Sequence, residues 1–255
     1  MEQTTEAYVK AFTHHNITTI EFFHPQSNSL PGALLQSLAE SIEVAGNEIE
    51  SKVIVLKSSG TKAFCAGASF DELIQITNKE EGLAFFSGFE KVINAMRLCP
   101  KLIIARIQGK CVGGGVGLAA AADYAIALDT ADIKLSELAV GIGPFVVGPA
   151  VERKMGLSAF STLAIDATCW RSANWAKQHG LFAEVHSNTN ELEEAVEKLA
   201  ATLSTSSPEA MKELKSIFWR GTENWDTLLK ERAAISGRLI LSEFSKNAIA
   251  KFKSK

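Results

Sequence analysis

A glycine-rich loop at residues 109–117 (GKCVGGGVG) is the first part of the sequence that could do chemistry. It contains three consecutive glycines, Gly113, Gly114 and Gly115, and it leads into an apolar stretch that predicts a helix. Glycine loses more conformational freedom on ordering than any other residue, so such a run makes sense where backbone N–H groups must face a ligand. The start of a helix adds positive potential at the same place. The loop could therefore hold a phosphate or a developing oxyanion.

A second loop, residues 62–70 (KAFCAGASF), joins a predicted strand to a predicted helical segment. Its residues are small around Gly67, so a flat ligand could approach the backbone closely. From the local pattern alone, an ordinary strand-to-helix turn is the alternative interpretation.

Glu137 is the candidate acid or base. It follows a short predicted strand and precedes an apolar stretch, residues 138–144. Desolvation raises the pKa of a carboxyl group, and a raised pKa suits proton transfer near neutral pH. The alternative is an exposed glutamate at a strand end, which composition alone favours.

A dinucleotide site is the competing interpretation of the glycine loop. Gly115, Gly117 and Ala120 fit the pattern G-x-G-x-x-A, which is weak when it stands alone. The helix would end by Asp123, and the next acidic residue, Asp129, comes too soon for the ribose of such a cofactor. We therefore do not expect a nicotinamide or flavin cofactor.

Cysteine and histidine spacings point away from metal and disulfide chemistry. The four cysteines have no CxxC spacing and the five histidines have no HxxxH or HExxH spacing. We expect reduced, buried thiols, no metal site, and no nucleophilic role for Cys65, since no histidine is placed to activate it.

These residues require strands and helices that hold them. Strands are predicted at residues 17–23, 52–58, 102–107, 124–128, 133–135 and near 181–185. Helices are predicted at residues 31–47, 80–98, from 208, and as one helix at 225–244. The sequence therefore predicts an α/β core over residues 1–195 and a helical C-terminal region over residues 196–255.

Composition excludes several classes of partner. A net charge of −3 and the lack of a Lys/Arg-rich run argue against nucleic acid, and no apolar run is long enough to span a membrane. The acidic, polar start of the chain resembles neither a secretory signal nor a transit peptide, so we expect a cytoplasmic protein.

Taken together, three segments resemble the enoyl-CoA hydratase/isomerase (crotonase) family over nearly the whole chain. They are AFCAGAS-x-x-EL after VIVL, then IIARIQGKCVGGGVGLAAAADYAIA, then IKLSELAVGIGP. The resemblance implies a spiral of ββα turns with a helical C-terminal oligomerisation region. It also implies a homo-oligomer, a trimer or a hexamer, that acts on an acyl-CoA substrate. Coenzyme A would then be part of the substrate, and no separate cofactor is expected.

The resemblance also assigns the site. The backbone N–H groups of Ala68 and Gly114 would form an oxyanion hole for the thioester oxygen as it becomes an enolate. The residues expected to bind the coenzyme A portion are Ser27, Lys62, Ala66 and Phe70.

One position departs from the family pattern. Family hydratases carry two glutamates; the second corresponds to Glu137, but the first position is Gly117. A single carboxylate suits a proton shift from C2 to C4 of a 3-enoyl thioester, so isomerisation is favoured. Hydration is the alternative, a non-catalytic CoA-binding protein a remoter one, and we expect Gly117→Glu to introduce hydration if the pocket has room.

Overall fold

Two sheets organise the computed structural model, which describes residues 6–253. The six-stranded sheet contains, in spatial order, β1 (Tyr8–His14), β2 (Ile17–Phe23), β3 (Val53–Ser58), β5 (Leu102–Ile107), β7 (Tyr124–Leu128) and β9 (Glu184–His186). The smaller sheet contains β4 (Ala63–Cys65), β6 (Lys110–Val112) and β8 (Ile133–Lys134). All pairings are parallel except the β1–β2 hairpin, which turns at His15 and Asn16.

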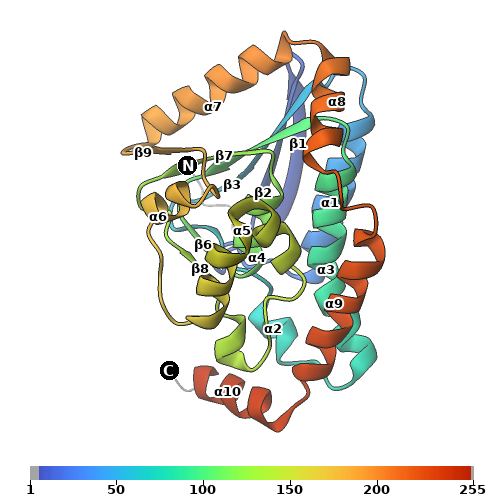
Figure 1. The fold of residues 1–255 in the computed structure, drawn as a ribbon, viewed down its shortest axis with the longest axis vertical. Coiled ribbons are helices and arrows are strands. Elements are labelled where there is room, and N and C mark those ends of the chain that lie inside the picture. Colours follow the sequence, from blue (N-terminus) through green and yellow to red (C-terminus); the bar gives the residue numbers. More distant parts are fainter. Residues whose placement is uncertain (1–5, 254–255) are drawn as a thin grey trace.

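Successive strands alternate between the two sheets. β3, β5 and β7 join the large sheet, and β4, β6 and β8, which follow them in the chain, join the small one. Helices α1 (Gly32–Asn47), α3 (Lys79–Leu98) and α4 (Gly114–Ala121) follow successive strand pairs. The chain therefore advances as a spiral of strand–strand–helix turns, as the resemblance implies (Figure 1).

Both faces of the large sheet are buried, which is why its central strands are almost wholly apolar. Helix α7 (Thr189–Ser204) covers one face, where Leu192 and Val196 pack with Val53, Val55 and Ile104 (Figure 1). The main core lies on the other face, under α1, α3 and α4. This core positions the carboxyl ends of β4 and β6, where both glycine-containing loops begin.

Helices dominate the second half of the described chain. They are α5 (Gly148–Ile165), α6 (Ala173–Gln178), α8 (Pro208–Phe218), α9 (Trp225–Leu239) and α10 (Glu243–Lys253), while the short α2 (Phe70–Leu73) lies earlier. Helix α9 packs along α3, and the two backbones touch where Gly82 meets Gly237. A Cβ at Gly82 would lie 2.7 Å from the Gly237 backbone, so glycine is needed at this crossing. None of the described helices is long and apolar enough to cross a membrane.

The predicted strands at 17–23, 102–107 and 124–128 are confirmed, but the single helix predicted at 225–244 is wrong. The chain breaks between α9 and α10, because the Ser242 hydroxyl accepts a hydrogen bond from the Ser245 N–H and caps a new helix. The Ser245 hydroxyl in turn donates to the carbonyl of Leu239 at the end of α9.

Two further boundaries differ from the prediction. The strand expected near 181–185 lies at Glu184–His186, because Leu181 and Phe182 are buried in the core ahead of it. Strand β8 ends at Lys134, one residue early, and Glu137 begins a single 3₁₀ turn, η1 (Glu137–Val140).

The division of the chain at residue 195 stays a prediction. That position lies inside α7. Residues 1–5 and 254–255, which the predicted ranges 1–195 and 196–255 include, lie outside the described residues.

Candidate active site

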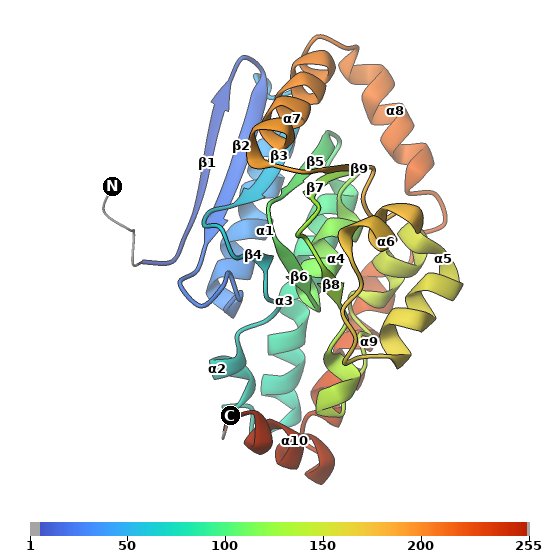
Figure 2. The same cartoon turned by 90° about the vertical axis from the view of Figure 1, so that its left-hand side faces the viewer.

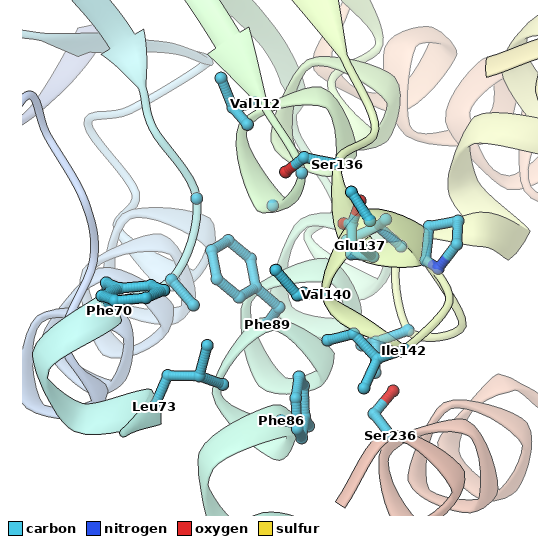
Figure 3. Close-up of a pocket in the computed structure, with 18 of the residues that line it drawn as sticks. Phe70, Leu73, Phe86, Phe89, Val112, Ser136, Glu137, Val140, Ile142 and Ser236 are labelled. Carbon is cyan, nitrogen blue, oxygen red and sulfur yellow. The ribbon is translucent and has the colours of Figure 1, made fainter. Parts of the chain in front are cut away.

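A cavity of about 630 Å³ lies where the carboxyl ends of β4 and β6 meet α3, η1 and α9. Its wall is mainly apolar. Figure 3 shows Val112, Ser136 and Glu137 toward one end, and Phe86, Ile142 and Ser236 toward the other. Each predicted catalytic and oxyanion-hole residue, namely Ala68, Gly114 and Glu137, lines this cavity.

Ala68 reaches the cavity because the loop around it is held on its outer side. Leu30 N–H donates to the Gly67 carbonyl (2.8 Å) and Ser69 N–H donates to the Leu30 carbonyl (3.1 Å). Gly67 has a φ of 93°, a left-handed conformation that glycine adopts without strain. The flanking bonds leave the Ala68 N–H without a protein acceptor among residues 6–253.

Gly114 is the first residue of α4, so its N–H has no partner within the helix. Pairing of Cys65 with Cys111 across β4 and β6 sets this loop beside the first one. A Cβ at Gly67 would lie only 3.7 Å from the Gly114 nitrogen, which shows how closely the two loops approach. The cavity is therefore lined by two free backbone donors from adjacent loops, the arrangement an oxyanion hole needs.

Gly114 must be a glycine for a packing reason that the local sequence pattern does not reveal. The ring of Phe89, from α3, lies against its Cα, and a Cβ there would be 2.1 Å from Phe89 Cζ. Phe89 therefore fixes the loop from the cavity side.

Glu137 lies against the same loop. A Cβ on Gly113 would lie 2.9 Å from Glu137 Oε1, and the Gly113 N–H donates to the Lys134 carbonyl (2.9 Å), which ties the loop to β8. Glu137 Oε2 is buried and has no hydrogen-bond partner among the described residues. Burial raises the pKa of Glu137 to about 7, although its own backbone N–H opposes the shift. The exposed-glutamate alternative is wrong, and within the described chain Glu137 is the only carboxylate that lines the cavity.

Gly117 faces an apolar wall. A Cβ there would lie 2.5 Å from Val147 Cγ1 and 2.8 Å from Val147 Cβ. Val147 lines the cavity just before α5 begins. The room on which the Gly117→Glu expectation depends is therefore occupied by Val147.

The four residues expected to bind coenzyme A divide into two pairs. Ala66 and Phe70 line the cavity, whereas Ser27 and Lys62 are exposed and lie outside its lining. From the turn that contains Ser27, Gln26 and Ser29 face the cavity instead.

Asn28 explains why that turn is fixed. Its side-chain amide donates to the carbonyls of Ser59 (2.8 Å) and Ala63 (2.9 Å). No sequence feature shows which residues of this turn face the cavity. Lys134, Thr168 and Ser236 also line the cavity and carry no sequence motif.

Cys65 is fully buried beneath the first loop. Burial raises the pKa of its thiol to about 12, so the thiolate needed for nucleophilic attack is scarce at neutral pH. This agrees with the expectation that Cys65 is not a nucleophile.

Comparison with known proteins gives one consistent result. The family model described as enoyl-CoA hydratase/isomerase matches residues 13–254. A short-chain-enoyl-CoA hydratase of Clostridium acetobutylicum is 28% identical over 230 residues, covering 89% of this chain and 87% of the relative. The human mitochondrial methylglutaconyl-CoA hydratase is 30% identical over 200 residues, covering 77% of this chain and 58% of the human protein.

Among solved structures, an enoyl-CoA hydratase from Bacillus halodurans superposes with a TM-score of 0.88. It covers 96% of this chain and 99% of its own, at 22% sequence identity. At that identity the likeness concerns the fold, and the expected crotonase-like spiral is confirmed.

Proposed function

The chain belongs to the enoyl-CoA hydratase/isomerase family, and we propose that it isomerises a 3-enoyl-CoA to a 2-enoyl-CoA thioester with Glu137 as its single acid and base. It is an enzyme of this family, so its substrate is an acyl-CoA thioester. The finer assignment rests on the geometry around Glu137 and Gly117.

The proposed reaction needs one proton carrier and one oxyanion hole. The thioester oxygen accepts hydrogen bonds from the Ala68 and Gly114 N–H groups, each worth about 3 kcal/mol of barrier. The Glu137 carboxylate takes a proton from C2, and the electrons of that C–H bond form a dienolate whose charge rests on the oxygen. Glu137 then returns the proton at C4, the C2–C3 double bond forms, and the carboxylate is regenerated.

The contact of Gly117 with Val147 is the observation that carries this proposal. Hydration requires a water molecule that is held and deprotonated while a proton reaches the α-carbon, a task that two carboxylates can share. Here a valine side chain occupies the space beside Gly117 where a second carboxylate would begin. The apolar side chain of Val147 in place of a second carboxylate supports proton transfer within the substrate over addition of water.

Hydration remains the second candidate function. The named relatives are hydratases, and Glu137 together with backbone groups could hold a water molecule. The two candidates differ in whether the product gains the mass of water.

Incubation of the purified protein with a 3-enoyl-CoA and, separately, with a 2-enoyl-CoA tests the proposal. We expect the 3-enoyl thioester to convert to the 2-enoyl isomer with no change of mass. Stereospecific gain of water by the 2-enoyl thioester at a comparable rate would overturn isomerisation in favour of hydration. Binding of both thioesters without turnover would support the non-catalytic alternative.

We also propose a homo-oligomer, a trimer or a hexamer, assembled through the helical C-terminal region. Exposed Leu214, Ile217 and Phe218 on α8 support this, because apolar side chains grouped on one helix suit a subunit contact. Light scattering that finds a stable monomer at micromolar concentration would contradict it. The free thiols of Cys65, Cys99 and Cys111 fit a reducing compartment such as the cytoplasm.

A further inference from the structure

Ser236 places a buried hydroxyl at the apolar end of the cavity. The residue is 1% exposed and lines the cavity, and its hydroxyl has no hydrogen-bond partner among residues 6–253. Other helical hydroxyls behave differently, since those of Ser41 and Thr202 donate to the carbonyl four residues earlier (2.7 and 2.9 Å). Figure 3 shows the Ser236 oxygen turned toward Ile142 and the cavity. This hydroxyl is therefore available to a ligand.

Packing of helix α9 does not account for a serine at this position. Trp225, Leu229 and Ala233 are buried at helical spacing ahead of Ser236, and together they form the stripe that α9 turns to the core. Helix α9 packs along α3 and leads into α10 (Figure 2). A buried hydroxyl without a partner lowers stability, so alanine would suit this stripe better. A ligand that the hydroxyl binds gives the serine a reason.

The side chains around Ser236 are apolar. Figure 3 shows Leu73, Phe86, Val140 and Ile142 on this side of the cavity, and these four side chains belong to one apolar cluster. In ligand sites of this kind, a single hydrogen-bonding group among apolar side chains fixes the orientation of the ligand. A site built to hydrogen-bond one group of a substrate also discriminates strongly against the analogue that lacks it.

The charges of the cavity indicate that the bound group is neutral. Within the described chain, Lys134 and Glu137 are the two charged residues that line the cavity. Lys134 pairs with Val112 across β6 and β8, which places its backbone at the end opposite Ser236 (Figure 3). A carboxylate beside Ser236 would thus be buried without a cation, at a far greater cost than a hydroxyl or a carbonyl.

We propose that Ser236 hydrogen-bonds a neutral hydroxyl or keto oxygen on the acyl chain, so that the substrate is an oxygenated acyl-CoA. The inference rests on the proposed function, because Glu137 must reach C2 and C4 of the chain, and Ser236 lies beyond Glu137 along the cavity. The serine hydroxyl can donate to a keto oxygen or accept from a hydroxyl. The carbons between Glu137 and Ser236 lie against the apolar cluster.

A series of matched 3-enoyl-CoA thioesters tests the subsite. At each chain length the remote end carries a methyl group, a hydroxyl, a methyl ketone or a carboxylate. We expect the wild type to prefer the hydroxyl or the ketone over the methyl form by about tenfold in kcat/KM at the length that reaches Ser236. Ser236→Ala should reduce this preference to about one. Ser204→Ala, a buried serine of α7 outside the cavity lining, should leave it unchanged.

Three outcomes overturn the proposal. The first is a wild type that uses the methyl form as well as the oxygenated forms at every chain length. The second is a wild type that prefers the carboxylate form, which would show that the group at Ser236 is charged. The third is a melting temperature several degrees lower in unliganded Ser236→Ala than in the wild type, which would show that the hydroxyl serves the fold.

Calorimetry with saturated acyl-CoA thioesters separates this inference from the proposed reaction, because it needs no turnover. We expect the wild type to bind the hydroxyl or ketone form about tenfold more tightly than the methyl form, and Ser236→Ala to bind them equally. Failure of the wild type to isomerise any 3-enoyl thioester would refute the proposed reaction and leave this binding preference measurable. Equal binding of all neutral forms by the wild type would refute only the role of Ser236.

Discussion

Two walls of the cavity differ in what they place beside the reacting carbons. On one wall, Glu137 holds a buried carboxylate oxygen without a hydrogen-bond partner among residues 6–253, and its pKa is raised to about 7. On the other wall, the cavity lining is Val147, whose side chain fills the space beside Gly117, so that Gly117 itself is not part of the lining. The first wall carries a carboxyl group whose pKa lies near neutral, whereas the second leaves no space for a side chain at Gly117. The contrast shows that an absent side chain can be as firmly built into a site as a catalytic one.

Replacing the Glu137 carboxylate gives the largest expected effect on turnover. Glu137→Gln keeps size and hydrogen-bonding capacity but cannot accept the α-proton, so turnover should fall about 10³-fold. Exchange of the α-proton with deuterated solvent, followed by NMR, should be abolished as well. Glu50→Gln, at an exposed position, controls for loss of a carboxylate. Retained exchange in Glu137→Gln would refute the single-carboxylate mechanism.

The Ala68 and Gly114 N–H groups stabilise the oxyanion that forms when Glu137 removes a proton. Removing one of these donors should lower turnover less than Glu137→Gln does. Ala68→Pro deletes the N–H of one donor and should lower kcat by about a hundredfold. Ala68→Gly keeps the N–H and is the control, and circular dichroism checks that both variants fold. Full activity in a folded Ala68→Pro would show that this donor plays no part. Proline at Gly114 is a poorer test, because the ring of Phe89 would collide with it.

The contact between Gly117 and Val147 can be tested through the free energy of unfolding. Gly117→Ala should lower the free energy of unfolding by about 1–3 kcal/mol, because the added methyl overlaps Val147. Urea denaturation measures the loss, and Val147→Ala in the same chain should recover part of it. If the two substitutions are additive, the contact does not set the packing here.

Substitutions at Gly117 and Val147 together also test whether a second carboxylate would introduce hydration. Gly117→Glu alone should fold poorly, whereas Gly117→Glu/Val147→Gly has space for the new side chain. We expect the double variant to add water to a 2-enoyl thioester faster than the wild type does. Equal hydration rates would mean that the apolar wall does not decide between the two reactions.

The pH dependence tests the Glu137 carboxylate without a substitution. The base is the carboxylate form, so kcat/KM should be near its plateau above pH 7 and fall about tenfold for each unit below the pKa of Glu137. A pantetheine thioester is the appropriate substrate, since it carries no phosphate that titrates nearby. A profile that is flat between pH 5 and pH 8 would contradict the role of Glu137.

Stability should respond to the same group in the opposite direction. Because the folded-state pKa is raised above 4.5, the fold favours the protonated form, and its stability declines as pH rises from about 4.5 through 7. Glu137→Gln should remove this part of the decline.

The sequence predicted those parts of the fold and site that depend on local pattern. Strand 102–107 is apolar except for Arg106, and three consecutive glycines, Gly113 to Gly115, mark the second loop. Strand β1 was missed because it is a half-exposed edge strand whose alternation is blurred by polar residues. Contacts between distant segments were also missed. The packing of Val147 on Gly117 and of Trp170 on Lys110 joins residues about 30 and 60 positions apart, and no local period encodes either.

The crossing of α3 and α9 fixes the position of one end of the cavity lining. Their backbones touch at Gly82 and Gly237, and Ser236, which precedes Gly237 in α9, lines the cavity. Because these backbones are already in contact, the two helices cannot approach each other more closely. A side chain in place of either glycine would instead push α9 away and carry Ser236 with it. The position of a cavity-lining residue is thus set by two glycines that lie outside the cavity lining.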